Sequence, residues 1–151
     1  MKKLARINTL FFFVSLGISA TAQSALPAEC TVMMQDRPVP SVLHAAAGYG
    51  KLDTEKVIII KELDQLLAIK CPTDASMWNG EPAINYAVVV SESELMRYLL
   101  KAGANPLLPT EIKRYFSGMN RLEIARNVHR RISSDEGKLV LEILEQAIAN
   151  R

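Results

Sequence analysis

The apolar side chains between residues 91 and 106 recur at the spacing of an α-helix. They lie three to four residues apart and are Leu95, Met96, Leu99 and Leu100. Side chains at this spacing share one face of a helix, so this face must be buried against another part of the chain. Gly103 can take the left-handed conformation that ends a helix, and Pro106 cannot continue one. The pattern predicts a short amphipathic helix that ends near Gly103.

A second, shorter helix is predicted immediately before this one. Asn79-Gly80 is a turn signal, and Pro82 suits the first position of a helix, because the amide that proline lacks would have no partner there. Ser91 followed by Glu94 has the spacing of a capping box, which would start the later helix. Residues 79–106 therefore form a predicted helix-turn-helix unit, and two short helices cannot bury the apolar face alone.

This unit resembles one ankyrin repeat over its whole length. The family pattern has a turn, Thr-Pro-Leu-His-x-Ala, a helix of the Val-x-x-Leu-Leu kind and a closing Gly-Ala-Asp/Asn. The matching segments are Asn79-Gly80, Pro82-Ala83-Ile84-Asn85-Tyr86-Ala87, Leu95-Met96-Arg97-Tyr98-Leu99-Leu100 and Gly103-Ala104-Asn105, where Pro82 and Asn85 replace the Thr and His of the motif. The resemblance implies an all-α fold, a short ankyrin-repeat solenoid of about three helix-turn-helix repeats with hairpin finger loops.

Two further copies of the motif are present. One has Leu43-His44-x-Ala46-Ala47 and Gly50, followed by an unusually long apolar helix over about residues 54–69. In the family the imidazole at the position of His44 bonds to backbone and stiffens the turns between repeats, so we expect His44 to have that role rather than a catalytic one. The weaker copy has Arg121-Leu122-Glu123-Ile124-Ala125 and then an apolar run over residues 140–147. Repeats are expected at about 41–71, 79–106 and 118–149.

The last helix has its own start signal. Ser133 and Glu136 repeat the capping-box spacing, which predicts that this helix begins near Ser134 or Asp135.

The N-terminus has the pattern of a secretory signal peptide. Lys2, Lys3 and Arg6 precede an apolar run over about residues 10–18, and Ala20-Thr21-Ala22 is a small-x-small cleavage site. The apolar run is too short for a membrane span, so we expect cleavage after Ala22, with an uncleaved anchor as the alternative. The signal is bacterial in style and predicts a periplasmic protein. Residues 23–40 would form an N-terminal extension, and residues 41–151 the repeat domain.

Cleavage changes the charge balance. The whole chain has 18 Lys and Arg against 16 Asp and Glu, and three of the basic residues lie in the signal, so 15 against 16 remain and the net charge is −1. A nearly neutral chain has no electrostatic reason to bind nucleic acid. Removing 22 of 151 residues leaves 129, which suits one domain, expected to be a monomer, with about three repeats.

The two cysteines, Cys30 and Cys71, both lie in the predicted mature part. In an oxidising compartment an even pair of cysteines is more often bridged than free, so we expect a disulfide between them. Such a bridge would tie the N-terminal extension to the end of the first repeat and contribute roughly 3–4 kcal/mol by chain entropy. The alternative, a redox-active pair, has no support from a Cys-x-x-Cys spacing.

Two finger loops carry the side chains that most often anchor protein interfaces. Aromatic and arginine residues dominate such anchors, and a tryptophan in a loop tip is unfavourable in water. The expected partner-binding residues in these fingers, with one on a first helix, are Met77, Trp78, Asn79, Tyr86, Lys113, Arg114, Tyr115 and Phe116. The alternative is that Trp78 and Phe116 fold back and cover the edge of a repeat.

The segment between residues 97 and 131 is locally basic, and the segment before it is locally acidic. Its basic residues are Arg97, Lys101, Lys113, Arg114, Arg121, Arg126, Arg130 and Arg131, against Glu111 and Glu123. A basic face would attract an acidic protein or an anionic membrane surface, and this attraction acts mainly on the association rate. The alternative is an ordinary solvated helix face, and we expect no membrane contact.

Signals for an enzyme are missing from the sequence. Histidine occurs only at positions 44 and 129, and no serine elbow, zinc spacing or phosphate loop is present. We therefore expect no enzyme activity, no cofactor, no metal site and no small-molecule substrate.

Two functions of a protein-binding module remain. One is a periplasmic inhibitor or immunity protein that neutralises a toxin or effector enzyme, for example of the type VI secretion type. The other is a stress-protection or assembly adaptor that binds an envelope protein. A rigid scaffold suits the first, because it binds without a large loss of conformational entropy.

Overall fold

The computed structural model describes residues 26–49, 53–76, 81–108 and 118–151. The predicted signal peptide, residues 1–22, lies outside the described residues. Among the helices of the described ranges, none has the length and apolar character needed to cross a membrane.

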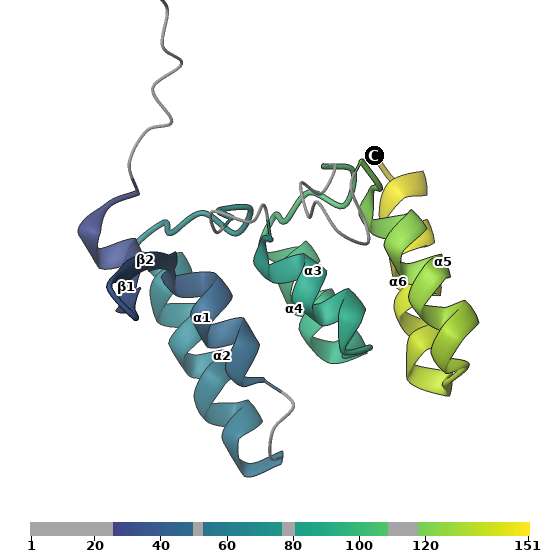
Figure 1. The fold of residues 1–151 in the computed structure, drawn as a ribbon, viewed down its shortest axis with the longest axis horizontal. Coiled ribbons are helices and arrows are strands. Elements are labelled where there is room, and N and C mark those ends of the chain that lie inside the picture. Colours follow the sequence, from purple (N-terminus) through teal and green to yellow (C-terminus); the bar gives the residue numbers. More distant parts are fainter. Residues whose placement is uncertain (1–25, 50–52, 77–80, 109–117) are drawn as a thin grey trace, which may run out of the picture.

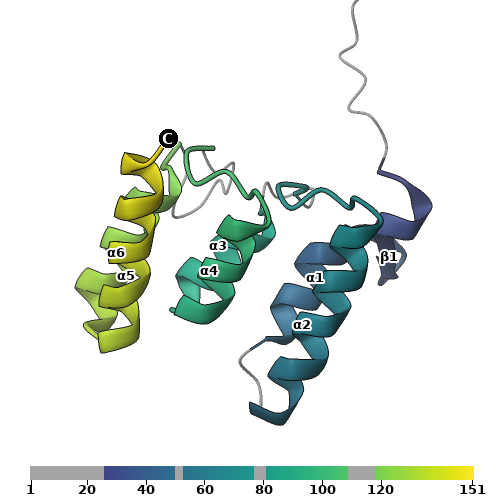
Figure 2. The ribbon, with the colours of Figure 1, turned by 180° about the vertical axis from the view of Figure 1, so that it is seen from behind.

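Three antiparallel helix pairs stand side by side and make up most of the described molecule (Figures 1 and 2). The elements in chain order are the 3-10 helix η1 (Ala28–Cys30), strands β1 (Thr31–Met34) and β2 (Arg37–Pro40), and helices α1 (Ser41–Gly48), α2 (Asp53–Ala68), α3 (Ala83–Val89), α4 (Ser93–Lys101), α5 (Arg121–Ile132) and α6 (Asp135–Ala149). The first helices of the pairs, α1, α3 and α5, pack against one another in sequence, and α4 packs against α6. Each segment that the sequence marks as a repeat contains one of these pairs.

The expected fold class, an all-α solenoid of three repeats, was wrong. The described residues are 63% helical and 9% strand, which is a small mixed α/β structure. Strands β1 and β2 form an antiparallel hairpin within the region expected to be only an N-terminal extension. Its two-residue turn has Gln35 and Asp36 at φ values of 47° and 60°. The second strand was not predicted because it contains Pro38 and Pro40, and proline normally indicates that a segment is not a strand.

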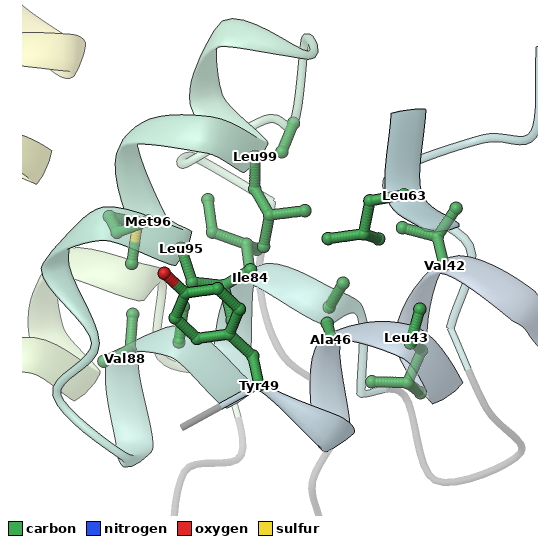
Figure 3. Close-up of a cluster of buried hydrophobic side chains, with 14 of the residues drawn as sticks. Val42, Leu43, Ala46, Tyr49, Leu63, Ile84, Val88, Leu95, Met96 and Leu99 are labelled. Atoms are coloured by element: carbon green, nitrogen blue, oxygen red, sulfur yellow. The ribbon is translucent and has the colours of Figure 1, made fainter. Parts of the chain in front are cut away.

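One hydrophobic core runs through the described residues from the hairpin to α6, and Figure 3 shows its part between α1, α2, α3 and α4. Ala46 of α1 and Ala83 and Ala87 of α3 have no exposed surface, and such small side chains let α1 and α3 approach closely. Larger side chains fill the remaining volume around them, and they include Leu63, Ile84, Leu95, Met96 and Leu99. The apolar face predicted over residues 91–106 is therefore buried, as its spacing requires.

Three helices end with the same backbone device. After α2, α3 and α4 the chain passes through one left-handed residue, and these residues are Lys70 (φ 63°), Ser91 (φ 57°) and Gly103 (φ 97°). The next amide then donates back to the last turn, in the bonds Cys71 N to Leu66 O, Glu92 N to Ala87 O and Ala104 N to Leu99 O, each 3.0 Å. This Schellman geometry satisfies carbonyl groups that the helix end leaves free. The predicted role of Gly103 is confirmed.

The predicted helix starts were partly wrong. Helix α4 follows Glu92, and no side chain caps it, because Ser91 belongs to the end of the preceding helix. Helix α6 begins at Asp135 as predicted, but its cap is Ser134, whose hydroxyl accepts from the amide of Gly137 at 3.0 Å.

Helix α5 starts with a capping box that was not predicted. The Asn120 side chain accepts from the Glu123 amide at 3.0 Å, and the Glu123 carboxylate accepts from the Asn120 amide at 2.8 Å.

A disulfide joins Cys30 to Cys71, the pair that the sequence analysis expected to be bridged. Both residues are buried, at the end of η1 and after the end of α2. The bridge therefore fixes the β1–β2 hairpin at the end of the row of helices, beside α1.

Candidate protein-binding surface

Most of the predicted partner-binding residues lie outside the described residues. Those of the first finger are Met77, Trp78 and Asn79, and those of the second are Lys113, Arg114, Tyr115 and Phe116. The remaining predicted residue, Tyr86, is half-buried on α3. It lines an open groove that the sequence did not predict.

We call this depression the α1 groove. It has a volume of about 820 Å³, and its lining includes Arg37 and Val39 of β2, His44 and Ala47 of α1, and Glu81 and Tyr86 at α3. β2, α1 and α3 follow one another from the hairpin end of the row of helices to its middle (Figure 1). The groove thus combines the hairpin with the first helices of two neighbouring pairs, which is why no single stretch of sequence predicts it.

The floor of the groove is apolar and closely packed. Val39 and Leu43 line it and are each only 5% exposed. At Gly48 a Cβ atom would lie 3.0 Å from Cδ1 of Ile59, so the missing side chain lets α1 approach α2 closely. A floor held by such packing has little freedom to rearrange, which favours binding by a surface that is already formed.

The rim of the groove is polar and carries both signs of charge. Arg37 lies on the hairpin side, and Glu62 and Glu81 lie on the helix side. An apolar floor with a few charged groups at its rim is the usual composition of a protein-binding patch.

His44 does not have the structural role that was expected. It is exposed on α1 and lines the groove, and its imidazole makes no hydrogen bond within the described part of the chain. Asn85, which takes the place of His in the next copy of the motif, is fully buried instead. His44 is therefore available to a partner, whereas Asn85 belongs to the interior.

A polar network ties the end of α1 to α2 and to the start of α4. The buried Tyr49 hydroxyl donates to Oε2 of Glu94 at 2.6 Å. Lys56 of α2 lies over the Tyr49 ring, with Nζ 5.5 Å from the ring centroid, and also pairs with Glu92 at 3.8 Å. A ring that is held both by packing and by a charge-assisted hydrogen bond is a rigid support.

A second network ties together the loops beside the two predicted fingers. Both carboxylate oxygens of Asp74 accept from the Asn105 amide, at 3.0 and 3.1 Å. Arg151 donates from Nη1 to Oδ1 of Asn105 at 2.9 Å and from Nη2 to the Ala104 carbonyl at 3.2 Å. Asp74 thereby holds the loop that follows α2 against the loop that follows α4, and Arg151 is bonded to the second of these loops.

Arg121, at the start of α5, is buried next to this network. It is only 1% exposed, and its Nε and Nη1 atoms have no hydrogen-bond partner among the described residues. Burial lowers the pKa of its guanidinium below the usual value, because a low dielectric disfavours the charged form, while the charge of Asp74 acts in the opposite direction.

The predicted basic face is smaller than the sequence suggested. Arg121 is buried, and Arg126 donates from Nη2 to Oε1 of Glu145 at 3.0 Å. The other predicted basic residues in the described part are exposed, and they are Arg97, Lys101, Arg130 and Arg131. Arg130 and Arg131 lie in the last turn of α5, where positive charge stabilises the helix itself.

Candidate metal ligands do not gather in the described ranges, where no three His, Cys, Asp or Glu residues lie close enough to hold an ion. No protein-family model, curated protein or solved structure matches the chain.

Proposed function

We propose that this chain is a periplasmic protein-binding module that neutralises a toxin or effector enzyme, for example one of the type VI secretion type. The observation that carries the proposal is the α1 groove, which has a buried apolar floor and a charged rim. A surface of this kind that is formed before binding loses little conformational entropy in the complex. This property favours tight inhibition of an enzyme.

The sequence supports a binding role in three ways. Residues 79–106 resemble a repeat whose family generally binds proteins, and the N-terminus resembles a bacterial secretory signal. The Cys30–Cys71 bridge suits an oxidising compartment. The mature chain is nearly neutral, so we propose neither nucleic acid nor a membrane as its partner.

The test is affinity capture of secreted and periplasmic proteins from the strain of origin, followed by mass spectrometry. We expect the wild-type chain to retain one stoichiometric enzyme and to inhibit that enzyme when both are purified. Recovery of a resident envelope protein alone would replace this proposal with the adaptor function. Recovery of nothing above background would contradict both functions.

A pair of matched variants locates the binding surface. Ala47→Arg places a long charged side chain in the α1 groove, and Val57→Arg places the same side chain on α2, where Val57 is 75% exposed outside the groove lining. Arginine is a good helix former, so both helices should persist. We expect Ala47→Arg to abolish capture and Val57→Arg to retain it. Equal capture by both variants would exclude the groove.

The predicted fingers need a separate variant. Trp78→Ala combined with Arg114→Ala removes the principal predicted anchor of each finger. We expect the helical circular dichroism and the melting midpoint to stay the same while capture is lost. Unfolding of this variant would instead assign the two residues to packing.

A further inference from the structure

The β1–β2 hairpin has two outer edges, and they differ in hydrogen-bonding capacity. The register pairs Thr31 with Pro40, Val32 with Val39, Met33 with Pro38 and Met34 with Arg37. In an antiparallel pair with a two-residue turn, the residues that flank the turn bond to each other, and every second pair bonds after that. Met34–Arg37 and Val32–Val39 are thus the bonded pairs. The main-chain groups of the other two pairs point away from the hairpin.

The outer edge of β2 is blocked to a further strand. Its two outward positions are Pro38 and Pro40, and proline has no N–H to donate. Prolines on an edge are a known protection against unwanted strand pairing. The two prolines are compatible with the strand only because they occupy these outward positions.

The outer edge of β1 has no such protection. Met33 directs both its N–H and its C=O outward, and Thr31 directs its C=O outward, while the Thr31 amide already bonds to the Ala28 carbonyl. Within the described ranges, no hydrogen bond engages the main chain of Met33, and the residue is 67% exposed. The edge therefore presents one donor and two acceptors at the spacing of an extended chain.

We propose that β1 binds an extended segment of the protein partner as an added third strand. This inference rests on the proposed function as a protein-binding module and names the form in which the partner binds. Main-chain groups of an extended peptide match the donor and acceptors of Thr31 and Met33, and strand addition of this kind is a general mode of peptide recognition. These main-chain bonds do not depend on the sequence of the bound segment. Specificity would therefore come from the contacts of its side chains.

The added strand would be continuous with the α1 groove. Side chains alternate along a strand, so Val32 and Met34 share the sheet face of Arg37 and Val39. Met34, Arg37 and Val39 line the groove. Every second side chain of an added strand would therefore lie on the groove side of the sheet.

A second copy of this chain is a poorer occupant of the edge. Strand β1 has four residues, so pairing two copies through it would bury far less than the roughly 1,200 Å² that stable interfaces need. A partner that also fills the groove does not have this limit.

The test uses a phage-displayed library of random ten-residue peptides, selected in parallel on the full chain and on two variants. Met33→Pro removes the outward N–H at a position of the same kind as Pro38, and Met33→Ala removes only the side chain. We expect peptides to be enriched on the wild type and on Met33→Ala, and to bind Met33→Pro roughly tenfold more weakly. Absence of enriched peptides, or equal binding to Met33→Pro, would overturn the proposal.

A measurement on the wild type alone guards against misfolding of the proline variant. An enriched peptide, synthesised and added to the wild-type chain, should slow hydrogen exchange of the Met33 amide. In an added strand, the N–H groups of alternate residues point toward β1 or away from it. Methylation of the backbone nitrogens that face β1 should abolish binding, and methylation of those that face away should not. An unprotected Met33 amide in a saturated complex would refute strand addition. Because these probes are synthetic, a negative result here leaves the capture of a natural partner as a separate outcome.

Discussion

The left-handed residues that follow the helices provide a test at the scale of single residues. Lys70 has a φ of 63°, a conformation that disfavours any side chain with a Cβ atom, and it is exposed. Lys70→Gly relieves this strain, although glycine also increases the conformational entropy of the unfolded chain. We expect a net gain of about 0.5–1 kcal/mol in the free energy of unfolding, measured by urea denaturation of the oxidised protein.

Gly103→Ala is the matched control in the opposite direction. Its φ is 97°, and a Cβ atom there would meet nothing within 4 Å, so any loss is conformational rather than steric. We expect a decrease of about 1 kcal/mol. If both substitutions changed stability in the same direction, backbone strain would not be the main cause of the two changes.

The three left-handed residues that follow helices, Lys70, Ser91 and Gly103, show what can be predicted at the scale of single residues. Gly103 was predictable because glycine at the end of a helical pattern marks a left-handed residue. Lys70 and Ser91 were not, because their side chains carry no such signal, and packing imposes the conformation. Ser91 also misled the assignment of a cap, since the spacing from Ser91 to Glu94 is equally compatible with a helix end.

At the scale of elements, a side-chain hydrogen bond joins α2 to α4. The Tyr98 hydroxyl donates to Oδ1 of Asp64 at 2.5 Å. Desolvation raises the pKa of Tyr98 well above its usual value near 10, and the hydrogen bond and the charge of Asp64 act in the same direction. Above pH 10 the unfolded chain loses this proton while the folded chain keeps it. The bond therefore contributes stability below pH 10, and the contribution falls as the pH rises beyond 10.

Tyr98→Phe removes this contribution. We expect a loss of about 1 kcal/mol at pH 7, because the pair is largely solvated, and a weaker decline of the melting midpoint between pH 9.5 and pH 11 than in the wild type. Asp64→Asn keeps an acceptor without the charge and should give an intermediate decline. Superimposable curves for wild type and Tyr98→Phe would show that the bond does not contribute to stability in solution.

Helices were more predictable than strands in this chain. Apolar spacing located α4, copies of the repeat motif located the other two helix pairs, and the long helix expected over about 54–69 is α2, Asp53–Ala68. The hairpin was missed because its second strand contains Pro38 and Pro40. A proline fits this strand only where its nitrogen points away from β1, and the pairing register alone determines which positions those are.

The candidate site is a property of the whole molecule and was therefore the least predictable feature. Tyr86 was identified as a surface residue of a first helix, but the groove beside it also needs Arg37 and Val39 of the unrecognised hairpin. Arg121 was counted among exposed basic residues, because a local charge count contains no information on burial. The finger residues remain predictions.

Removal of the disulfide tests whether the hairpin and the helices depend on each other. Cys30 and Cys71 are 41 positions apart and fix the hairpin wall of the α1 groove to the end of α2. Cys30→Ala combined with Cys71→Ala should decrease the free energy of unfolding by roughly 3–4 kcal/mol by chain entropy. In the surviving folded fraction, faster hydrogen exchange should be confined to residues 26–40, while the amides of α3 to α6 stay protected.

Partner capture by this variant connects stability with function. If the groove needs its hairpin wall, capture should fall even at a temperature where the helical circular dichroism equals that of the wild type. Chemical reduction of the wild type should give the same result, and reoxidation should restore capture. Full capture by a chain whose hairpin exchanges freely would contradict both the groove as binding surface and strand addition at β1, and would leave the predicted fingers, residues 77–79 and 113–116, as the candidate binding surface.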